Sequence, residues 1–227
     1  MSTVLITGAN RGLGWEYARQ YADEGWRVIA TCRDPQNAME LASLEGEVEI
    51  HALDIGDHGQ ILSLANSLRK EAIDLLLNNA GIFDSRPSKL GDIDYNTWEE
   101  FMHINVMSPL MVCASFSDHV AASNLKKIAI MSSKMGSIDD NSSGGSYVYR
   151  STKAALNAVM KSLSVDLYPR GISVAILHPG WVRTDMGGPN GLIDAPESVN
   201  GLRQVIKGLN LKNSGRFYNY DGSEIPW

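Results

Sequence analysis

The sequence predicts an α/β fold, a doubly wound domain in which a parallel sheet of about seven strands carries helices on both faces. Short apolar runs alternate with longer segments whose apolar residues recur at helical spacing, which is the pattern of successive βαβ units. The chain has 227 residues, enough for one substantial core and few for two. We therefore expect a single domain over residues 1–227.

Six segments have the length and composition of buried strands, and a seventh candidate follows them near the end of the chain. These segments are Val4–Thr7, Val28–Thr31, Val48–Leu53, Leu75–Asn78, Lys127–Ser132, Ser173–His178 and Arg216–Tyr220. Helical spacing starts at Leu13 in the first connection, and Gly25 supplies a left-handed stop. Further helices are expected over Asp34–Leu44, Asp57–Lys70, Asn96–Ala122, Tyr149–Tyr168 and Pro196–Lys207.

Composition excludes several classes of function. A net charge of −6 gives no electrostatic basis for binding the phosphate backbone of a nucleic acid, so nucleic acid is not an expected partner. No stretch is apolar enough for a membrane span, and the first strand begins too early for a secretion signal, so a cytoplasmic location is expected. Cys32 and Cys113 are expected to be reduced thiols. The histidines lack metal-ligand spacing, and no metal is expected.

A glycine-rich turn follows the first strand and opens directly into the first helix. Glycines at 8, 12 and 14 let the backbone turn tightly and approach a pyrophosphate, while N–H groups at the helix N-terminus favour negative charge. An ordinary tight βα turn is the alternative. The turn predicts a dinucleotide site of Rossmann type, with contacts from Gly8, Asn10, Arg11, Gly12, Leu13 and Gly14.

The type of dinucleotide is indicated by the end of the second strand. An NAD site usually presents Asp or Glu there, whereas this chain has Cys32 followed by Arg33. Arg33 and Arg11 could converge on a 2′-phosphate through charge-assisted hydrogen bonds, which favours NADP(H). The alternative is that Arg33 pairs only with Asp34 or solvent and that Arg11 merely covers the turn.

Tyr149 and Lys153 lie four residues apart at the start of a predicted helix, so their side chains share one face. The pKa of a free phenol is about 10, and a neighbouring ammonium is expected to lower it. Such a pair can exchange a proton with a substrate oxygen. Tyr147 is a second candidate by position, but it has no lysine four residues on.

The glycine spacing and the Tyr-x-x-x-Lys pair together resemble the short-chain dehydrogenase/reductase family, and the resemblance extends over essentially the whole chain. Asn78–Gly81 resembles the NNAG motif of the family, and the segment that begins Pro179–Gly180 resembles its PGxVxT motif. The resemblance implies that Asp54 binds adenine and that Thr184 binds the nicotinamide carboxamide. The further dinucleotide-binding residues that it implies are Ile55, Asn79, Ala80, Gly81, Tyr149, Lys153, Pro179, Gly180 and Val182.

The same resemblance implies roles for two more polar residues. Ser133 begins the S-x-x-G pattern, whose serine polarises the substrate carbonyl, and Ser132 fits that pattern less well. The gap from Ser133 to Tyr149 exceeds the usual family spacing, with the surplus in an Asn/Ser/Gly loop. Asn105 matches the asparagine that kinks a central helix and holds a water linked to Lys153. A surface or capping amide is the alternative for Asn105.

These features predict an NADPH-dependent reductase that converts an aldehyde, ketone or quinone to an alcohol, with Tyr149 as general acid. The lid segment after Thr184 and the aromatic residues near the end of the chain are similar to those of sniffer/C-factor carbonyl reductases. The alternative is an NADP-binding regulatory or signalling protein, since a fold alone does not establish activity. The substrate itself and the choice between a homodimer and a homotetramer are not readable from the sequence.

Overall fold

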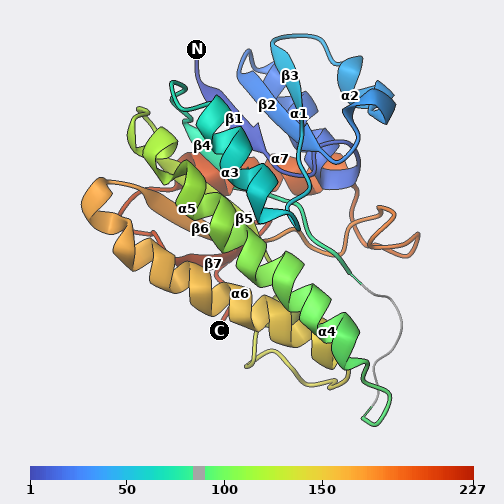
Figure 1. Cartoon of the computed structure of the whole chain (residues 1–227). Coiled ribbons are helices and arrows are strands. Elements are labelled where there is room, and N and C mark those ends of the chain that lie inside the picture. The colour runs from blue at the N-terminus through green and yellow to red at the C-terminus, as the bar shows by residue number, and fades with distance from the viewer. Residues whose placement is uncertain (84–89) are drawn as a thin grey trace.

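The computed structural model describes residues 1–83 and 90–227. Its centre is a seven-stranded parallel sheet in the order β3-β2-β1-β4-β5-β6-β7, so the chain reverses its direction of winding between β1 and β4 (Figure 1). The strands are β1 (Thr3–Ile6), β2 (Arg27–Cys32), β3 (Val48–Ala52), β4 (Leu75–Asn78), β5 (Lys127–Met131), β6 (Ser173–His178) and β7 (Arg216–Asn219). The predicted doubly wound α/β class and all seven predicted strands are confirmed.

The helices connect these strands in the expected order. The α-helices are α1 (Gly12–Asp23), α2 (Met39–Ala42), α3 (His58–Ser67), α4 (Tyr95–Met102), α5 (Ser108–Ala121), α6 (Tyr147–Asp166) and α7 (Ala195–Gly208). Short 3-10 turns are η1 (Pro35–Asn37), η3 (Lys134–Gly136) and η4 (Tyr168–Arg170). Gly25 and Gly171 have φ values of 75° and 73°, the left-handed conformation expected where a helix stops.

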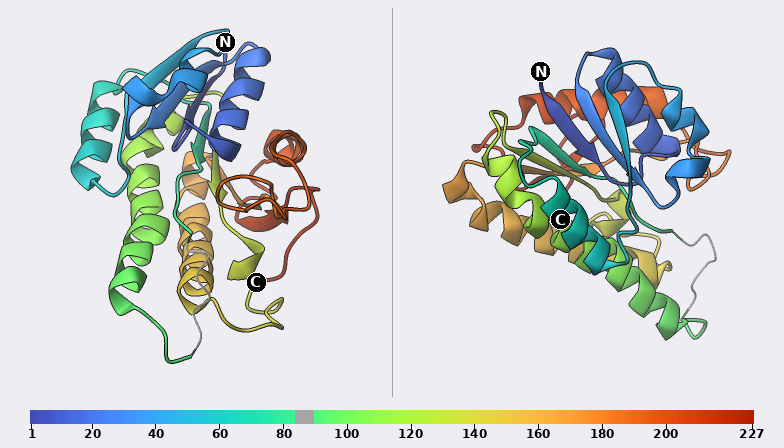
Figure 2. Two further views of the ribbon diagram at one scale, coloured as in Figure 1. Left: turned by 90° about the vertical axis from the view of Figure 1, so that its right-hand side faces the viewer. Right: turned by 45° about the horizontal axis from the view of Figure 1, so that its top comes forward.

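Both faces of the sheet are covered by apolar side chains. Alternate residues of β5 show this, because Ile128 and Ile130 join a core with α3, α5 and α6, whereas Ala129 and Met131 join a core with α1, α2 and α7. Figure 2 shows helices on the two sides of the sheet, with α5 and α6 side by side. A sheet covered on both faces leaves its carboxyl edge as the natural place for a ligand.

Two helix predictions were wrong. The segment predicted as one helix over Asn96–Ala122 is interrupted by a π-helical stretch, η2 (His103–Met107), between α4 and α5. The helix predicted over Asp34–Leu44 is replaced by η1 and the single turn α2, because the Asp34 carboxylate accepts from the N–H and the side chain of Asn37 and starts a short 3-10 turn instead.

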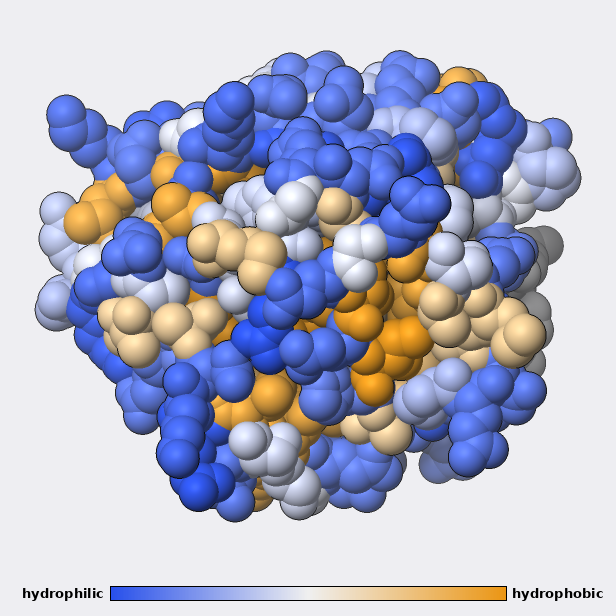
Figure 3. All heavy atoms as spheres, turned by 90° about the horizontal axis from the view of Figure 1, so that it is seen from above, coloured by the Kyte–Doolittle hydropathy of each residue, from blue (hydrophilic) through white to orange (hydrophobic). Residues whose placement is uncertain are grey.

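The surface agrees with the acidic, polar composition. The face in Figure 3 is mostly hydrophilic, with apolar residues scattered over it and gathered near its centre. Within residues 1–83 and 90–227, no helix combines the length and the apolar character needed to cross a membrane. Cys32 and Cys113 are free, buried thiols.

Candidate active site

The predicted site residues follow the carboxyl ends of neighbouring strands. The glycine turn follows β1, Arg33 follows β2, Asn79 to Gly81 follow β4, Ser133 follows β5 and Pro179 follows β6. Because all these strands are parallel, their following loops meet at one edge of the sheet. The fold therefore gathers segments that are far apart in sequence.

The glycine turn has the geometry that its sequence predicts. Gly8 and Gly12 have φ values of 66° and 55°, which other residues rarely adopt. A Cβ on Gly14 would lie 2.6 Å from the Asn79 Nδ2 and still closer to the Gly8 carbonyl oxygen, so this position has room only for glycine. Helix α1 begins without a side-chain cap, so no side chain satisfies its first N–H groups. The turn is a cradle suited to an anion.

The residues after β4 support this cradle. The Asn79 Nδ2 donates to the carbonyl oxygens of Thr7 and Gly8, each at 3.0 Å. The Thr7 hydroxyl accepts from the N–H groups of Asn79 and Ala80, also at 3.0 Å. Side chains from two strands therefore fix the turn before any ligand is bound.

A cavity of about 540 Å³ opens beside the turn, between residues 10–12, residues 37–40 and Asp185. Arg11 pairs with Asp185 at 3.3 Å, and both side chains are exposed. Arg33 is exposed and has no ion pair within the described part of the chain. Since the Asp34 carboxylate is held by Asn37, the alternative pairing of Arg33 with Asp34 is not found. Sequence reasoning missed residues 37–40 and Asp185, because no motif marks them.

The other predicted dinucleotide residues line the same edge. The Asp54 Oδ1 accepts from the Gly56 N–H at 2.9 Å, which fixes the turn after β3, and Ile55 is buried. Gly180 has a φ of 82°, and Val182 is buried. A Cβ on Gly12 would lie 3.7 Å from the Thr184 Cγ2, so the segment after β6 reaches the glycine turn.

Tyr149 lies close enough to Ser133 for the serine hydroxyl to lower the pKa of the phenol by hydrogen bonding. The Tyr149 ring also meets Phe83 edge-on, with the ring centroids 4.8 Å apart. Burial raises the pKa of Tyr149 to about 12, and the Ser133 hydrogen bond opposes that rise. The pKa of this phenol was expected to be lowered, but burial raises it. The phenol is therefore protonated at neutral pH.

Lys153 extends from α6 toward the end of β5. Its Nζ donates to the Met131 carbonyl oxygen at 3.0 Å and lies 5.7 Å from the centroid of the Tyr149 ring. Burial lowers the pKa of Lys153 to about 8. The amine is thus mostly charged at neutral pH, yet it can release a proton under mildly alkaline conditions.

Asn105 lies in the π-helical stretch and is 1% exposed, so the alternative of a surface amide was wrong. Its Oδ1 accepts from the Ile82 N–H and its Nδ2 donates to the Ile82 carbonyl oxygen. A Cβ on Gly81 would lie 3.1 Å from the Asn105 Oδ1 and 3.9 Å from the Lys153 Nζ. Asn105 and Lys153 thus approach each other across Gly81.

The two adjacent serines after β5 have different partners. The Ser132 hydroxyl donates to the Asn157 Oδ1 at 2.6 Å and is buried against α6. Ser133 is the serine that contacts Tyr149. The S-x-x-G pattern, which favours Ser133, agrees with the different surroundings of the two serines.

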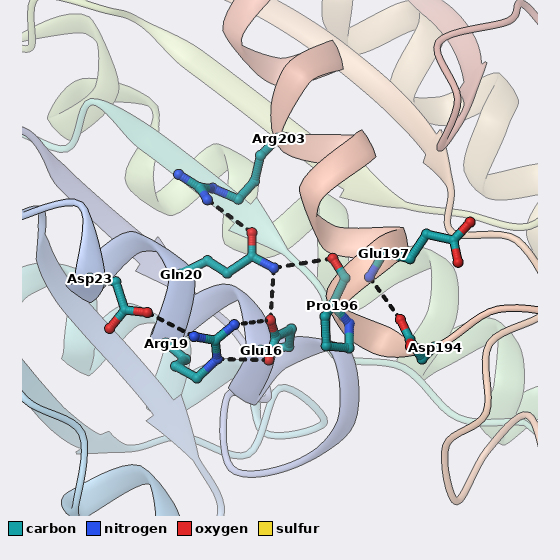
Figure 4. A network of polar contacts seen from close by, with 8 residues as sticks. All are labelled: Glu16, Arg19, Gln20, Asp23, Asp194, Pro196, Glu197 and Arg203. Carbon is teal, nitrogen blue, oxygen red and sulfur yellow. Dashed lines mark hydrogen bonds and ion pairs between the residues drawn. The ribbon is translucent and has the colours of Figure 1, made fainter.

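A polar network joins α1, which follows the glycine turn, to α7 (Figure 4). Glu16 is 2% exposed and accepts from Arg19 and from Gln20. Gln20 in turn donates to the Pro196 carbonyl oxygen at 3.2 Å and accepts from Arg203 at 2.9 Å. The helix behind the phosphate cradle is therefore tied to the helix that follows the loop after Thr184.

Comparison with known proteins identifies the class of this fold and site. The model of the short chain dehydrogenase family matches residues 2–191, and the chain belongs to this family. The predicted family resemblance is thus confirmed, and the protein is an oxidoreductase of the short-chain dehydrogenase/reductase type with a Rossmann-like fold.

Two curated relatives illustrate the range of the family. The C-signal of Myxococcus xanthus is 45% identical over 155 residues, which cover 68% of this chain and 93% of that protein. The 1-hydroxy-2-glutathionyl-2-methyl-3-butene dehydrogenase of a Rhodococcus species is 33% identical over 100% of both chains.

Two solved structures superpose over essentially the whole chain. The carbonyl reductase Sniffer of D. melanogaster is 34% identical with a TM-score of 0.92, covering 100% of both chains. An NADPH-bound carbonyl reductase from chicken fatty liver is 33% identical with a TM-score of 0.91, covering 100% of this chain and 99% of that one.

Proposed function

We propose that this protein is an NADPH-dependent carbonyl reductase that converts an aldehyde, ketone or quinone to an alcohol. The observation that carries this proposal is the cluster of three side chains at the carboxyl edge of β5. The Tyr149 phenol lies near the Ser133 hydroxyl, which acts on its pKa, and beside the buried Lys153 amine. Such a cluster can bind a carbonyl oxygen, donate a proton to it and stabilise the phenolate left behind.

The residues present fit a dinucleotide. The tight approach of Gly8, Gly12 and Gly14 leaves a cradle that any Cβ at position 14 would fill, and the uncapped start of α1 offers N–H donors to a pyrophosphate. When bound, NADPH supplies a hydride to the carbonyl carbon. The carbonyl reductase structures from chicken and from Pseudomonas aeruginosa were solved with NADPH and NADP, which supports this choice.

The proton follows a route through side chains of this chain. Tyr149 gives its phenolic proton to the carbonyl oxygen, whose position is steadied by a hydrogen bond from Ser133. The Lys153 ammonium stabilises the resulting phenolate and returns a proton to it. Asn105, which meets Lys153 across Gly81, is placed to hold a water that reprotonates the amine.

Preference for NADP(H) rests on charge. Arg33 is an exposed cation at the end of β2, and no acidic residue takes the place of Cys32 beside it. Arg11 borders the cavity next to the glycine turn. Two guanidiniums on this side favour a 2′-phosphate over free ribose hydroxyls.

The loop after Thr184 supports an apolar carbonyl substrate. Met186 and Leu192 are 50% and 75% exposed, so apolar surface is available on this loop. The buried free thiols of Cys32 and Cys113 suit a reducing compartment, which supports a cytoplasmic location.

The test is a screen of NADPH oxidation at 340 nm across aldehydes, ketones and quinones, with the wild type and Tyr149→Phe. We expect at least one carbonyl compound to be reduced, and the variant to lose turnover while binding NADPH with similar affinity. The Phe side chain keeps the packing against Phe83 and removes only the proton donor. Reductase activity that survives in Tyr149→Phe would refute the role of the phenol.

A second candidate function is a regulatory or signalling protein that binds NADP with little turnover. The similarity to the Myxococcus xanthus protein named C-signal favours it. The two functions differ in the screen above, because a regulatory protein would bind NADPH and oxidise it with none of the compounds. The enzyme is favoured because chemically competent side chains occupy all four predicted catalytic positions, Ser133, Tyr149, Lys153 and Asn105. Nucleotide binding alone would require only the glycine turn.

A further inference from the structure

The position of Ser133 depends on the short turn η3 that follows it. The Ser133 carbonyl oxygen accepts from the Gly136 N–H at 2.8 Å, and its hydroxyl accepts from the Met135 N–H at 3.2 Å. The next bond of the turn joins the Ser137 N–H to the Lys134 carbonyl oxygen at 2.9 Å. A shift of this turn would therefore move the hydroxyl that contacts Tyr149.

The inner side of the turn rests on helix α6. A Cβ on Gly136 would lie 2.7 Å from the Lys153 carbonyl carbon and 2.9 Å from the Lys153 Cβ. The turn thus touches the helix backbone at the residue that carries the amine. Because α6 is a long helix packed on the sheet, this contact gives the turn a rigid inner support.

The outer side of the turn is held by Trp227. The main-chain oxygen of Trp227 accepts from the Ser137 hydroxyl at 3.1 Å, from the Asp139 N–H at 3.2 Å and from the Ile138 N–H. Ser137 is 2% exposed, so these bonds are partly shielded from water. Figure 2 shows the end of the chain beside this segment. Three donors from consecutive residues converge on one oxygen.

Trp227 is itself fixed to the core. Its indole stacks on Phe217 with the ring centroids 5.8 Å apart and the planes 19° apart. Phe217 belongs to β7 and is fully buried. The Ile225 N–H donates to the Phe217 carbonyl oxygen at 2.8 Å, and Ile225 is buried as well. The oxygen that receives the three donors is therefore held in place by the edge strand of the sheet.

We propose that Trp227 is a positioning residue for carbonyl reduction: its main-chain oxygen holds the outer side of the Ser133 turn and so keeps Ser133 against Tyr149. This inference rests on the proposed function. The glycine cradle lies after β1, whereas Trp227 contacts β7 and residues 137–139. Loss of the Trp227 contacts should thus impair the carbonyl step and leave dinucleotide binding unchanged.

Three variants distinguish the contribution of the Trp227 main-chain oxygen from that of its indole ring. Trp227→Phe keeps both the oxygen and an aromatic ring, Trp227→Ala keeps only the oxygen, and a chain that stops at Pro226 has neither. We expect kcat/KM for the carbonyl to be near wild type in Trp227→Phe, lower in Trp227→Ala, and lower by about tenfold or more in the shortened chain, the equivalent of one net hydrogen bond. The Kd for NADPH should stay within about twofold in all three.

Ser137→Ala provides a variant that removes one donor and leaves Trp227 intact. We expect it to lower kcat/KM by severalfold, with an unchanged Kd for NADPH. Should the shortened chain fail to fold, Ser137→Ala and Trp227→Ala still decide the matter. Wild-type kcat/KM in both would overturn the proposal.

A double-mutant cycle with Ser133→Ala distinguishes positioning from general destabilisation. If Trp227 acts through Ser133, then Trp227→Ala costs activity in the wild type and almost nothing further in the Ser133→Ala background. Additive losses would show that Trp227 acts independently of Ser133, and would overturn the inference. If the wild type reduces no carbonyl, or if Tyr149→Phe retains activity, the proposed function fails instead.

Discussion

Two hydrogen bonds, both 2.9 Å long, join the side-chain amide of Asn105 to the main chain of Ile82. The Asn105 Oδ1 accepts from the Ile82 N–H, and the Asn105 Nδ2 donates to the Ile82 carbonyl oxygen. Asn105 is also the centre of the π-helical stretch η2. π-helical turns often occur at functional sites. Here the altered helix places one amide against the segment that follows the NNAG motif.

Asn105→Ala should destabilise the protein, because it leaves the N–H and the carbonyl oxygen of Ile82 without their partner. We expect the free energy of unfolding in urea to fall by about 1–3 kcal/mol, the usual cost of an unsatisfied buried polar group. Carbonyl reduction should fall as well, since the amide that we propose holds a water near Lys153 is lost. Asn200→Ala, at an exposed position of α7, is the control and should change stability by less than about 0.5 kcal/mol.

Gly14→Ala should abolish NADPH binding. The added Cβ would lie 2.6 Å from the Asn79 Nδ2, so α1 must move away from the glycine turn. The N–H groups at the start of α1 would then no longer point at the bound pyrophosphate. Fluorescence titration with NADPH measures this loss. Gly208→Ala is the matched control, because a Cβ there meets no atom within 4 Å. Equal NADPH affinity in the two variants would contradict the assignment of the cradle.

Arg33→Ala should change the choice of dinucleotide. We expect kcat/KM with NADPH to fall by about tenfold or more, which corresponds to one charge-assisted hydrogen bond, while kcat/KM with NADH changes little. The control is Arg69→Ala, which removes an arginine that follows α3. A wild-type enzyme that prefers NADH would overturn the NADP(H) assignment itself.

His178 should make the protein less stable in acid. Burial, aided by the nearby Lys134 charge, lowers the pKa of His178 to about 4 from its usual 6.5, and Asp140 opposes this shift. Between these two pH values the unfolded chain binds a proton that the folded chain does not. The stability that neutral His178 contributes is therefore complete above pH 6.5 and is lost as the pH falls toward 4.

Urea unfolding of wild type and His178→Gln at pH 7 and pH 5 measures this loss. The wild type should lose about 2 kcal/mol more than the variant between pH 7 and pH 5, since pH 5 lies about 1.5 units below the usual pKa of 6.5 and one pKa unit corresponds to about 1.4 kcal/mol. Parallel pH dependence in the two proteins would rule out His178 as the source.

Local sequence patterns correctly predicted the structural elements that depend only on residues close together in the chain. The strand ends, the left-handed stop at Gly25 and the glycine turn agree with the structure because hydrophobic period and glycine conformation are properties of short segments. The choice of Ser133 over Ser132, made from the S-x-x-G spacing, stays a prediction. The oligomeric state stays a prediction.

Features that depend on contacts between residues far apart in the chain were not predicted from the sequence. The family resemblance implied a kink at Asn105, but no periodicity predicts the π-helical stretch or the bonds from Asn105 to Ile82. The pKa of Tyr149 was expected to be lowered, whereas burial, which only the fold determines, raises it. The roles of Trp227 and Asp185 were missed for the same reason, since each acts through residues far along the chain.

The attachment of both ends of the loop after β6 has a consequence for how this protein can diverge. At one end of this loop the Thr184 side chain lies next to Gly12, and at the other end the Pro196 carbonyl oxygen accepts a hydrogen bond from the Gln20 side chain. The segment between these attachments, residues 186–193, folds back on residues 181–184, because the Leu192 N–H donates to the Trp181 carbonyl oxygen and the Arg183 N–H donates to the Ile193 carbonyl oxygen. We expect changes at the exposed positions of this segment to alter which compound is accepted, while the dinucleotide site stays the same.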